Sequence, residues 1–129
     1  QVNGVVHTHS TYATTIAITG RGIPACHYMI AAAGGPTIRC APYARYGTEA
    51  LSQYALDALE DRNCCLLANH GMIATGTSLD KAMWLAVELE TISKQYYHSL
   101  LIGGPNILTD AQIDETIKGF STYGLQDPK

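Results

Sequence analysis

One stretch near the middle of the chain decides the fold: Cys64-Cys65-Leu66-Leu67-Ala68-Asn69-His70-Gly71-Met72-Ile73-Ala74-Thr75. Apolar residues, typical of buried strands, fill both halves of this stretch, and the Asn-His-Gly between them is typical of a tight turn. We therefore predict two short strands, over 64–68 and 72–75, joined by a turn. The turn presents the His70 side chain at its tip, where it can face a cleft.

The flanking sequence predicts strands that alternate with helices. Residues 4–9 and 37–43 are short and apolar, as expected for strands. Three helices are predicted over 48–63, 78–102 and 109–119, each opened by a Ser or Thr that can cap its first turn. The interleaving of strands and helices indicates the α/β class.

Two segments are less clear. The Thr-rich stretch 10–19 favours a strand by propensity, but Ser10 could cap a helix that carries Ala13, Ile16 and Ala17 on one face. We favour the helix. Ile23-Pro24 opens a segment that we expect to be extended through Tyr28 and to lead into the small residues 31–35.

Composition sets the class of protein. The 129 residues, 47 % hydrophobic, are enough for one domain with a real core, which excludes a disordered chain. A net charge of −3 without a basic stretch argues against nucleic acid as a partner. We find no signal peptide and no apolar run of about 18–20 residues, so we expect no membrane span. Only 15 % of residues are charged, which suggests that a partner covers part of the surface.

The four cysteines predict a cytoplasmic location. None of them belongs to a CxxC pair, and Cys64 and Cys65 are adjacent in an apolar run. We expect buried free thiols rather than disulfides or a cysteine-rich zinc site, which fits a reducing compartment.

Three histidines are candidate metal ligands. His7 and His9 are two residues apart on a predicted strand, so their side chains point to the same face and can converge on one ion. The alternative is a hydrogen-bonded pair at the surface. His70 could supply a third nitrogen from its turn, although histidine also tolerates the unusual backbone angles of turns. Three histidines leave an open position on zinc, as catalytic sites do.

The chemistry of such a site stays open from the residues alone. A three-histidine metal can generate hydroxide for hydrolysis or polarise a carbonyl as a Lewis acid. Tyr28, Tyr46 and Tyr123 lie outside regular helix positions and could either pack at an interface or donate a proton. We interpret His27 as a structural residue and His98 as a packed or surface residue of the helix predicted over 78–102.

Four stretches together resemble the class II aldolase and adducin family, and the likeness extends through 121–124. They occur in the order 5–10, 23–35, 40–44 and 69–71. The resemblance implies a three-layer α/β/α fold around a central mixed, largely antiparallel sheet. It also implies one domain over 1–129, from which the N-terminal part of the family domain is absent, and a homotetramer.

The resemblance further implies a zinc-dependent lyase. Its reaction would be the retro-aldol cleavage of the small-molecule sugar phosphate L-fuculose 1-phosphate to dihydroxyacetone phosphate and L-lactaldehyde. Zn²⁺ would disperse the negative charge left beside the carbonyl when the carbon–carbon bond breaks. The residues that match the family's zinc ligands are His7, His9 and His70.

The tyrosines take roles from the same resemblance. Tyr28 matches a catalytic tyrosine that protonates or stabilises the aldehyde oxygen and reaches in from a neighbouring subunit. Tyr123 matches a catalytic tyrosine near the C-terminus, beside the aldehyde pocket. Tyr46 matches an aromatic position that lines this substrate pocket.

One feature of the family has no counterpart in the chain. The acid/base glutamate and most phosphate-binding residues precede the His-x-His strand in the family. We place the chain's own glutamates on helix surfaces: Glu49, Glu60, Glu88, Glu90 and Glu115. We therefore expect zinc binding with little or no turnover.

Three other functions remain as alternatives. A related sugar-phosphate 4-epimerase would carry a more acidic segment at 27–30. A non-enzymatic adducin-like interaction module would be expected to lack the three histidines. A zinc hydrolase of unrelated fold requires that the resemblance be discarded.

Overall fold

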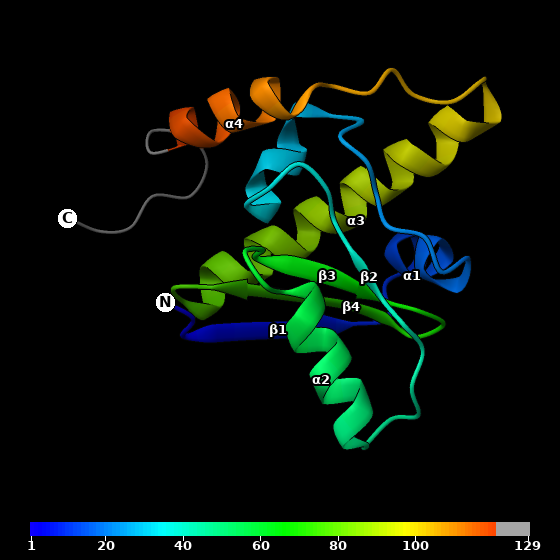
Figure 1. The fold of residues 1–129 in the computed structure, drawn as a ribbon, viewed down its shortest axis with the longest axis vertical. Helices are drawn as coiled ribbons and strands as arrows, with labels where there is room; N and C mark the ends of the chain where they lie inside the picture. The colour runs from blue at the N-terminus through cyan, green and yellow to red at the C-terminus, as the bar shows by residue number, and fades with distance from the viewer. Residues whose placement is uncertain (121–129) are drawn as a thin grey trace.

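The computed structural model describes residues 1–120 and contains four strands, four α-helices and one 3₁₀-helix, η1 (Figure 1). In chain order they are β1 (Gly4–Thr8), α1 (Thr11–Ile18), η1 (Tyr28–Ala33), β2 (Cys40–Ala41), α2 (Glu49–Ala58), β3 (Cys64–Leu67), β4 (Gly71–Gly76), α3 (Leu79–Leu101) and α4 (Asp110–Gly119). No helix in this described part combines the length and the apolarity that a bilayer-spanning segment needs.

The four strands form one mixed sheet in the order β1-β4-β3-β2. β4 pairs antiparallel with both β1 and β3, whereas β2 pairs parallel with β3. The predicted strand pair around His70 is confirmed as the antiparallel pair β3 and β4. The mixed, largely antiparallel sheet that the resemblance implies is therefore confirmed.

The sheet is covered on both faces, because side chains alternate along each strand. Val6 and Leu66 point into the larger core, which the sheet forms with α1, α3, α4 and η1. Cys65 and Leu67 point the other way and pack with α2. Figure 1 shows α2 and α3 on opposite sides of the sheet. This confirms the three-layer α/β/α arrangement.

Three of the predicted helix starts are confirmed by their caps. Thr48, Ser78 and Thr109 each accept a hydrogen bond from the backbone N–H three residues later, at the starts of α2, α3 and α4. Thr109 also forms a full capping box with Gln112. Local sequence therefore determines where these helices begin.

The helix predicted after Ser10 is confirmed as α1, but its cap is not Ser10. The Ser10 side chain makes no capping hydrogen bond. The backbone N–H groups of Tyr12 and Ala13 donate instead to the carboxylate of Glu90 on α3. Glu90, which we expected on a helix surface, is half-buried on α3 and joins α3 to α1.

The segment predicted to be extended from Ile23 is non-helical through His27, but Tyr28 already begins the 3₁₀-helix η1. His27 caps it, with its Nδ1 accepting a hydrogen bond from the backbone N–H of Met29 at 3.0 Å, and Gly34 ends it with a positive φ of 87°. Its apolar residues are buried in the larger core, so packing favours the helical turn. His27 has the structural role expected of it.

The strand predicted over 37–43 pairs only at Cys40–Ala41, with one isolated bridge between Ile23 and Ile38. Pro36 and Pro42 bracket the segment, and proline has no N–H to donate to a sheet ladder. The short pairing follows from these two residues.

All four cysteines are free thiols, as predicted. Cys64 and Cys65 are buried in β3. Burial raises the pKa of both thiols, that of Cys65 to about 12, which keeps them protonated and unreactive.

Candidate metal centre

His7, His9 and His70 converge at one end of the sheet, although His70 lies far from the other two in sequence. One ring nitrogen from each histidine lies within 4.8 Å of those of the other two. The three ring centroids are 4.9–5.0 Å apart, and the rings meet edge to face. The three side chains, which we call the histidine cluster, could hold a metal ion.

Strand pairing brings the cluster together. Thr8, the last residue of β1, lies opposite Met72 near the start of β4. His9 follows Thr8, and His70 precedes β4 in the turn that leads out of β3. The antiparallel register between β1 and β4 therefore places both histidines beyond the same end of the strand pair.

A backbone hydrogen bond orients His7. Its Nδ1 lies 2.7 Å from the carbonyl oxygen of Met72. Because a carbonyl oxygen only accepts, Nδ1 carries the proton, and Nε2 keeps a free lone pair. Histidine ligands of metals in proteins are commonly oriented by such a bond from their other nitrogen.

Each residue of the turn Asn69-His70-Gly71 has a separate function. Asn69 adopts a positive φ of 58°, which asparagine tolerates better than most residues. Gly71 lets β1 approach, because a Cβ at this position would overlap the carbonyl oxygen of Thr8 and lie 3.0 Å from Cδ2 of His9. His70 supplies the imidazole between them.

The surroundings of His70 favour its neutral form. Its partial burial lowers its pKa, and the neighbouring imidazoles of His7 and His9 lower it further. A metal binds the neutral ring, so these surroundings favour coordination. Three imidazole nitrogens suit zinc, and with three protein ligands one position stays open for a substrate.

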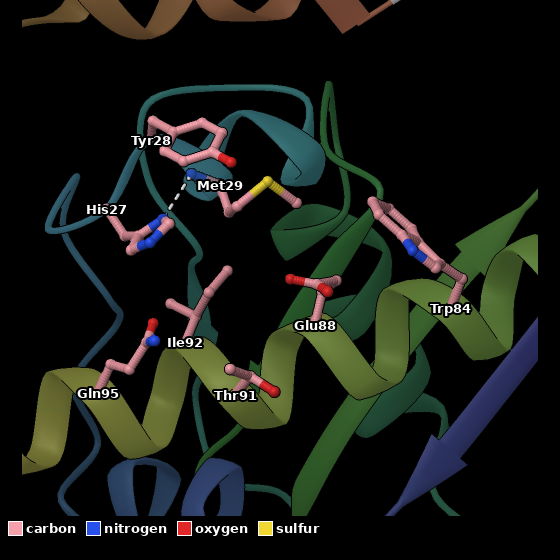
Figure 2. Close-up of a pocket in the computed structure, with 8 residues that line it drawn as sticks. All are labelled: His27, Tyr28, Met29, Trp84, Glu88, Thr91, Ile92 and Gln95. Atoms are coloured by element: carbon pink, nitrogen blue, oxygen red, sulfur yellow. Dashed lines mark hydrogen bonds between the residues drawn. The ribbon is translucent and has the colours of Figure 1, made fainter. Parts of the chain in front are cut away.

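Tyr28 does not join the histidine cluster within the chain. It lies at the start of η1, is 42 % exposed and stacks on His27 with ring centroids 4.8 Å apart. It lines a pocket of about 310 Å³ between η1 and α3, together with His27, Met29, Trp84, Glu88, Thr91, Ile92 and Gln95 (Figure 2). His7 lies opposite Ile73 on the neighbouring strand, so its side chain is on the same face of the sheet as that of Ile73, which packs with α2. The pocket lined by Tyr28 lies on the other face of the sheet, in the layer of η1 and α3.

The other two tyrosines are not placed at the cluster either. Tyr46 precedes α2 and is 74 % exposed, with the guanidinium carbon of Arg45 5.6 Å from its ring centroid. Tyr123 lies outside the described residues. The structure therefore brings the three predicted metal ligands together and leaves the predicted tyrosine roles untested.

Sequence reasoning missed Glu90 as a residue connected to this site. Its carboxylate holds the start of α1, two residues after His9. One signal was available in the sequence. On α3, Glu90 follows Ala86 by four residues and Leu89 by one, and both are buried, so it lies at the edge of the buried stripe.

The chain matches a known family over most of its length. A family model described as "Class II Aldolase and Adducin N-terminal domain" matches residues 1–97. A 5-methylthioribulose-1-phosphate/5-deoxyribulose-1-phosphate aldolase of Rhodospirillum rubrum is 50 % identical over 123 residues, which cover 95 % of this chain and 56 % of that protein. The L-fuculose phosphate aldolase of Escherichia coli K12 is 47 % identical over 125 residues, which cover 96 % of this chain and 58 % of that protein.

A solved structure agrees with these relatives. A structure named L-fuculose 1-phosphate aldolase superposes with a TM-score of 0.88 at 39 % identity, over 91 % of this chain and 55 % of that one. The chain thus spans little more than half the length of the proteins that it matches.

Proposed function

The chain belongs to the class II aldolase and adducin N-terminal domain family, and on that premise we propose that it is the metal-binding part of a zinc-dependent lyase. The proposed reaction is the retro-aldol cleavage of a ketose 1-phosphate. The observation that carries the proposal is the histidine cluster, in which three ligand nitrogens lie within 4.8 Å of one another.

The cluster would hold the ion through one nitrogen of each ring. His7 offers Nε2, because its Nδ1 donates to Met72. When bound, zinc supplies a positive charge that stabilises the negative charge developing beside the carbonyl as the carbon–carbon bond breaks. The exposure of His7 and His9 leaves the cluster accessible to a small-molecule substrate.

We assign the proton at the aldehyde oxygen to Tyr28. In cleavage the hydroxyl that becomes the aldehyde loses its proton, which the phenolate form of a tyrosine can take up; in the reverse reaction the phenol so formed returns the proton to the same oxygen. Tyr28 lies in the layer opposite His7, so we propose that it acts at the cluster of a neighbouring copy in a homotetramer. Its exposure supports this role, because the side chain can reach a second chain.

We give Tyr123 a second catalytic role at the aldehyde pocket and Tyr46 a role in lining that pocket. Both roles rest on the family resemblance of the sequence. Four further statements stay predictions that rest on the sequence: the single domain over 1–129, its missing N-terminal part, the cytoplasmic location and the little turnover expected of this chain.

The substrate we propose is L-fuculose 1-phosphate, after the names of the relative that is 47 % identical, an L-fuculose phosphate aldolase, and of the solved structure that superposes on the chain, an L-fuculose 1-phosphate aldolase. The relative that is 50 % identical favours a second candidate, 5-deoxyribulose 1-phosphate or its methylthio analogue. These compounds are all ketose 1-phosphates, so one retro-aldol reaction releases dihydroxyacetone phosphate from each. They differ in the aldehyde that is released.

The relatives favour a lyase over the alternatives raised by the sequence. The two similar proteins reported above are named as aldolases rather than epimerases. An adducin-like interaction module would have no use for three converging imidazoles, and this chain retains all of them. The zinc hydrolase of unrelated fold is excluded by the family match.

The test measures dihydroxyacetone phosphate released from L-fuculose 1-phosphate and, separately, from 5-deoxyribulose 1-phosphate. The assay uses the zinc-loaded 129-residue chain and a longer chain extended upstream of Gln1, each with and without a chelator. We expect chelator-sensitive release by the longer chain and little by the shorter one. Full activity of the shorter chain would contradict our expectation of an absent catalytic glutamate. If neither zinc-loaded chain released product from either substrate, the proposed function would be wrong.

A further inference from the structure

Helix α1 joins the two segments that carry the histidine cluster. It begins at Thr11, two residues after His9. At its other end, the carbonyl oxygen of Ala17 accepts the backbone N–H of Asn69 at 3.1 Å, and that of Ile18 accepts the Asn69 side-chain amide at 3.4 Å. Asn69 immediately precedes His70, so a shift of α1 moves His9 and His70 together.

The start of α1 is held from outside the helix. Tyr12 N–H lies 3.0 and 3.1 Å from the two carboxylate oxygens of Glu90, and Ala13 N–H lies 2.8 Å from one of them. The Oγ of Ser10, the residue that would ordinarily cap the helix, is buried without a hydrogen-bond partner. Glu90 therefore satisfies two of the free N–H groups of the first turn, where its negative charge is also favoured.

Glu90 also lies beside the end of β1. It lines a pocket of about 240 Å³ together with Thr8 and Ser10, the residues on either side of His9. The pocket is otherwise formed mainly by apolar side chains of α3 and by Met72, whose carbonyl oxygen orients His7. The Glu90 carboxylate thus contacts the helix that follows His9, and Glu90 lines the same pocket as the two residues that flank His9 in sequence.

We propose that Glu90 is a positioning residue of the metal centre: by fixing α1 on α3, it sets the positions of His9 and of the Asn69-His70 turn. This proposal rests on the proposed function, because it requires that the histidine cluster bind a metal. Glu90 is given no contact with the metal or the substrate. Its effect reaches the ion through the backbone of α1 at one end and through Asn69 at the other.

The experiment compares metal binding by four versions of the 129-residue chain: wild type, Glu90→Ala, Glu90→Gln and Thr48→Ala. Zn²⁺ affinity is measured by competition with a chromophoric chelator, and the visible absorption of bound Co²⁺ reports the ligand geometry. Thr48→Ala is the matched control, because it also removes a helix N-cap, on α2 across the sheet from α1. Thermal unfolding of each apo chain gives the accompanying loss of stability.

We expect Glu90→Ala to weaken Zn²⁺ binding about tenfold and to change the Co²⁺ spectrum, as loss of an outer support of a metal ligand does. Glu90→Gln keeps an oxygen acceptor for the two N–H groups and should stay within about threefold of wild type, with the wild-type spectrum. Thr48→Ala should lower stability and leave affinity and spectrum unchanged.

Two results would overturn the positioning role while leaving the metal centre intact. One is Glu90→Ala binding both ions as wild type does. The other is Thr48→Ala weakening binding as much as Glu90→Ala, which would reduce Glu90 to a contributor to general stability. Failure of the wild-type chain itself to bind either ion would instead refute the proposed function, and the positioning role with it.

Discussion

The fold gathers the three side chains of the histidine cluster at one place, whereas it holds Tyr28 and Tyr46 on separate parts of the chain. The three imidazoles come from two distant segments and meet with ring centroids about 5 Å apart. Tyr28 lies at the start of η1 and Tyr46 precedes α2; their side chains are 42 % and 74 % exposed, and Tyr28 lines a pocket between η1 and α3.

The difference lies in what holds each group. Hydrogen bonds to the backbone fix the histidines: the β1–β4 ladder, the bond from the His7 ring to the carbonyl oxygen of Met72, and the bonds from Asn69 to carbonyl oxygens of α1. Tyr28 begins a short 3₁₀-helix and lines a pocket between η1 and α3 (Figure 2). One chain is therefore sufficient to assemble the three predicted metal ligands, whereas the proposed role of Tyr28 requires a second copy.

The largest effect is expected from His70→Ala. Removing one of three nitrogens leaves two ligands from one strand end, so we expect Zn²⁺ affinity to fall by more than about 100-fold. Competition with a chromophoric chelator measures the loss. His98→Ala, which removes an imidazole from α3, is the control and should bind as wild type does. Equal affinity of His70→Ala and wild type would remove His70 from the ligand set.

A smaller effect is expected from Gly71→Ala. The new Cβ would overlap the carbonyl oxygen of Thr8 and press on His9, so β1 and β4 must move apart at this point. We expect the free energy of unfolding to fall by about 1–3 kcal/mol and Zn²⁺ affinity to fall about tenfold.

Urea unfolding and zinc titration test this prediction, with Gly119→Ala as the control. Among residues 1–120, a Cβ at Gly119 would meet no atom within 4 Å outside its own helix backbone, so this variant should unfold at the wild-type urea concentration or slightly above it. If Gly71→Ala matched Gly119→Ala in both measurements, the close approach of β1 to the turn would not matter for the site.

Asn69→Ala should have a weaker effect. Alanine is less tolerant of the φ of 58° and loses the side-chain bond to Ile18, so we expect a loss of about 1 kcal/mol in the free energy of unfolding. Asn69→Gly keeps the backbone freedom and loses only the side-chain bond, so it should cost less. The same unfolding titration separates the two variants. An Asn69→Gly variant less stable than Asn69→Ala would show that the backbone angle is not the main cost.

Tyr28→Phe should have the smallest effect on metal binding, and it therefore tests whether Tyr28 and the histidine cluster are separate within one chain. We expect Zn²⁺ affinity within about twofold of wild type, because Tyr28 lies in the layer opposite the cluster. In whichever chain shows turnover, cleavage should fall about 100-fold, as expected for loss of the group that takes up the proton of the substrate hydroxyl. Reduced zinc affinity in this variant would contradict the separation of the two groups.

Sequence patterns predicted most of the fold because the decisive signals are local. The caps at Thr48, Ser78 and Thr109 and the Asn-His-Gly turn act within a few residues, and each appears where predicted. The convergence of His7 with His9 follows from strand alternation, which is also a local rule.

The features that the sequence did not reveal depend on distant contacts. The capping of α1 by Glu90 joins residues 78 positions apart in sequence. The sequence around Ser10 does not indicate that its side chain leaves the start of the helix uncapped. The helical form of Tyr28–Ala33 depends on burial in the larger core. The position of Tyr28 relative to the histidine cluster depends on how the whole sheet is assembled, because no local sequence pattern includes both.

The most direct test of the account is zinc K-edge X-ray absorption on the wild-type chain loaded with one equivalent of Zn²⁺. If the histidine cluster holds the ion, the first shell consists of nitrogen and oxygen at about 2.0–2.1 Å, with outer-shell scattering from three imidazole rings. Sulfur scattering at about 2.3 Å would place the ion on the cysteines, and a shell without imidazole scattering would place it elsewhere; either result would contradict the account.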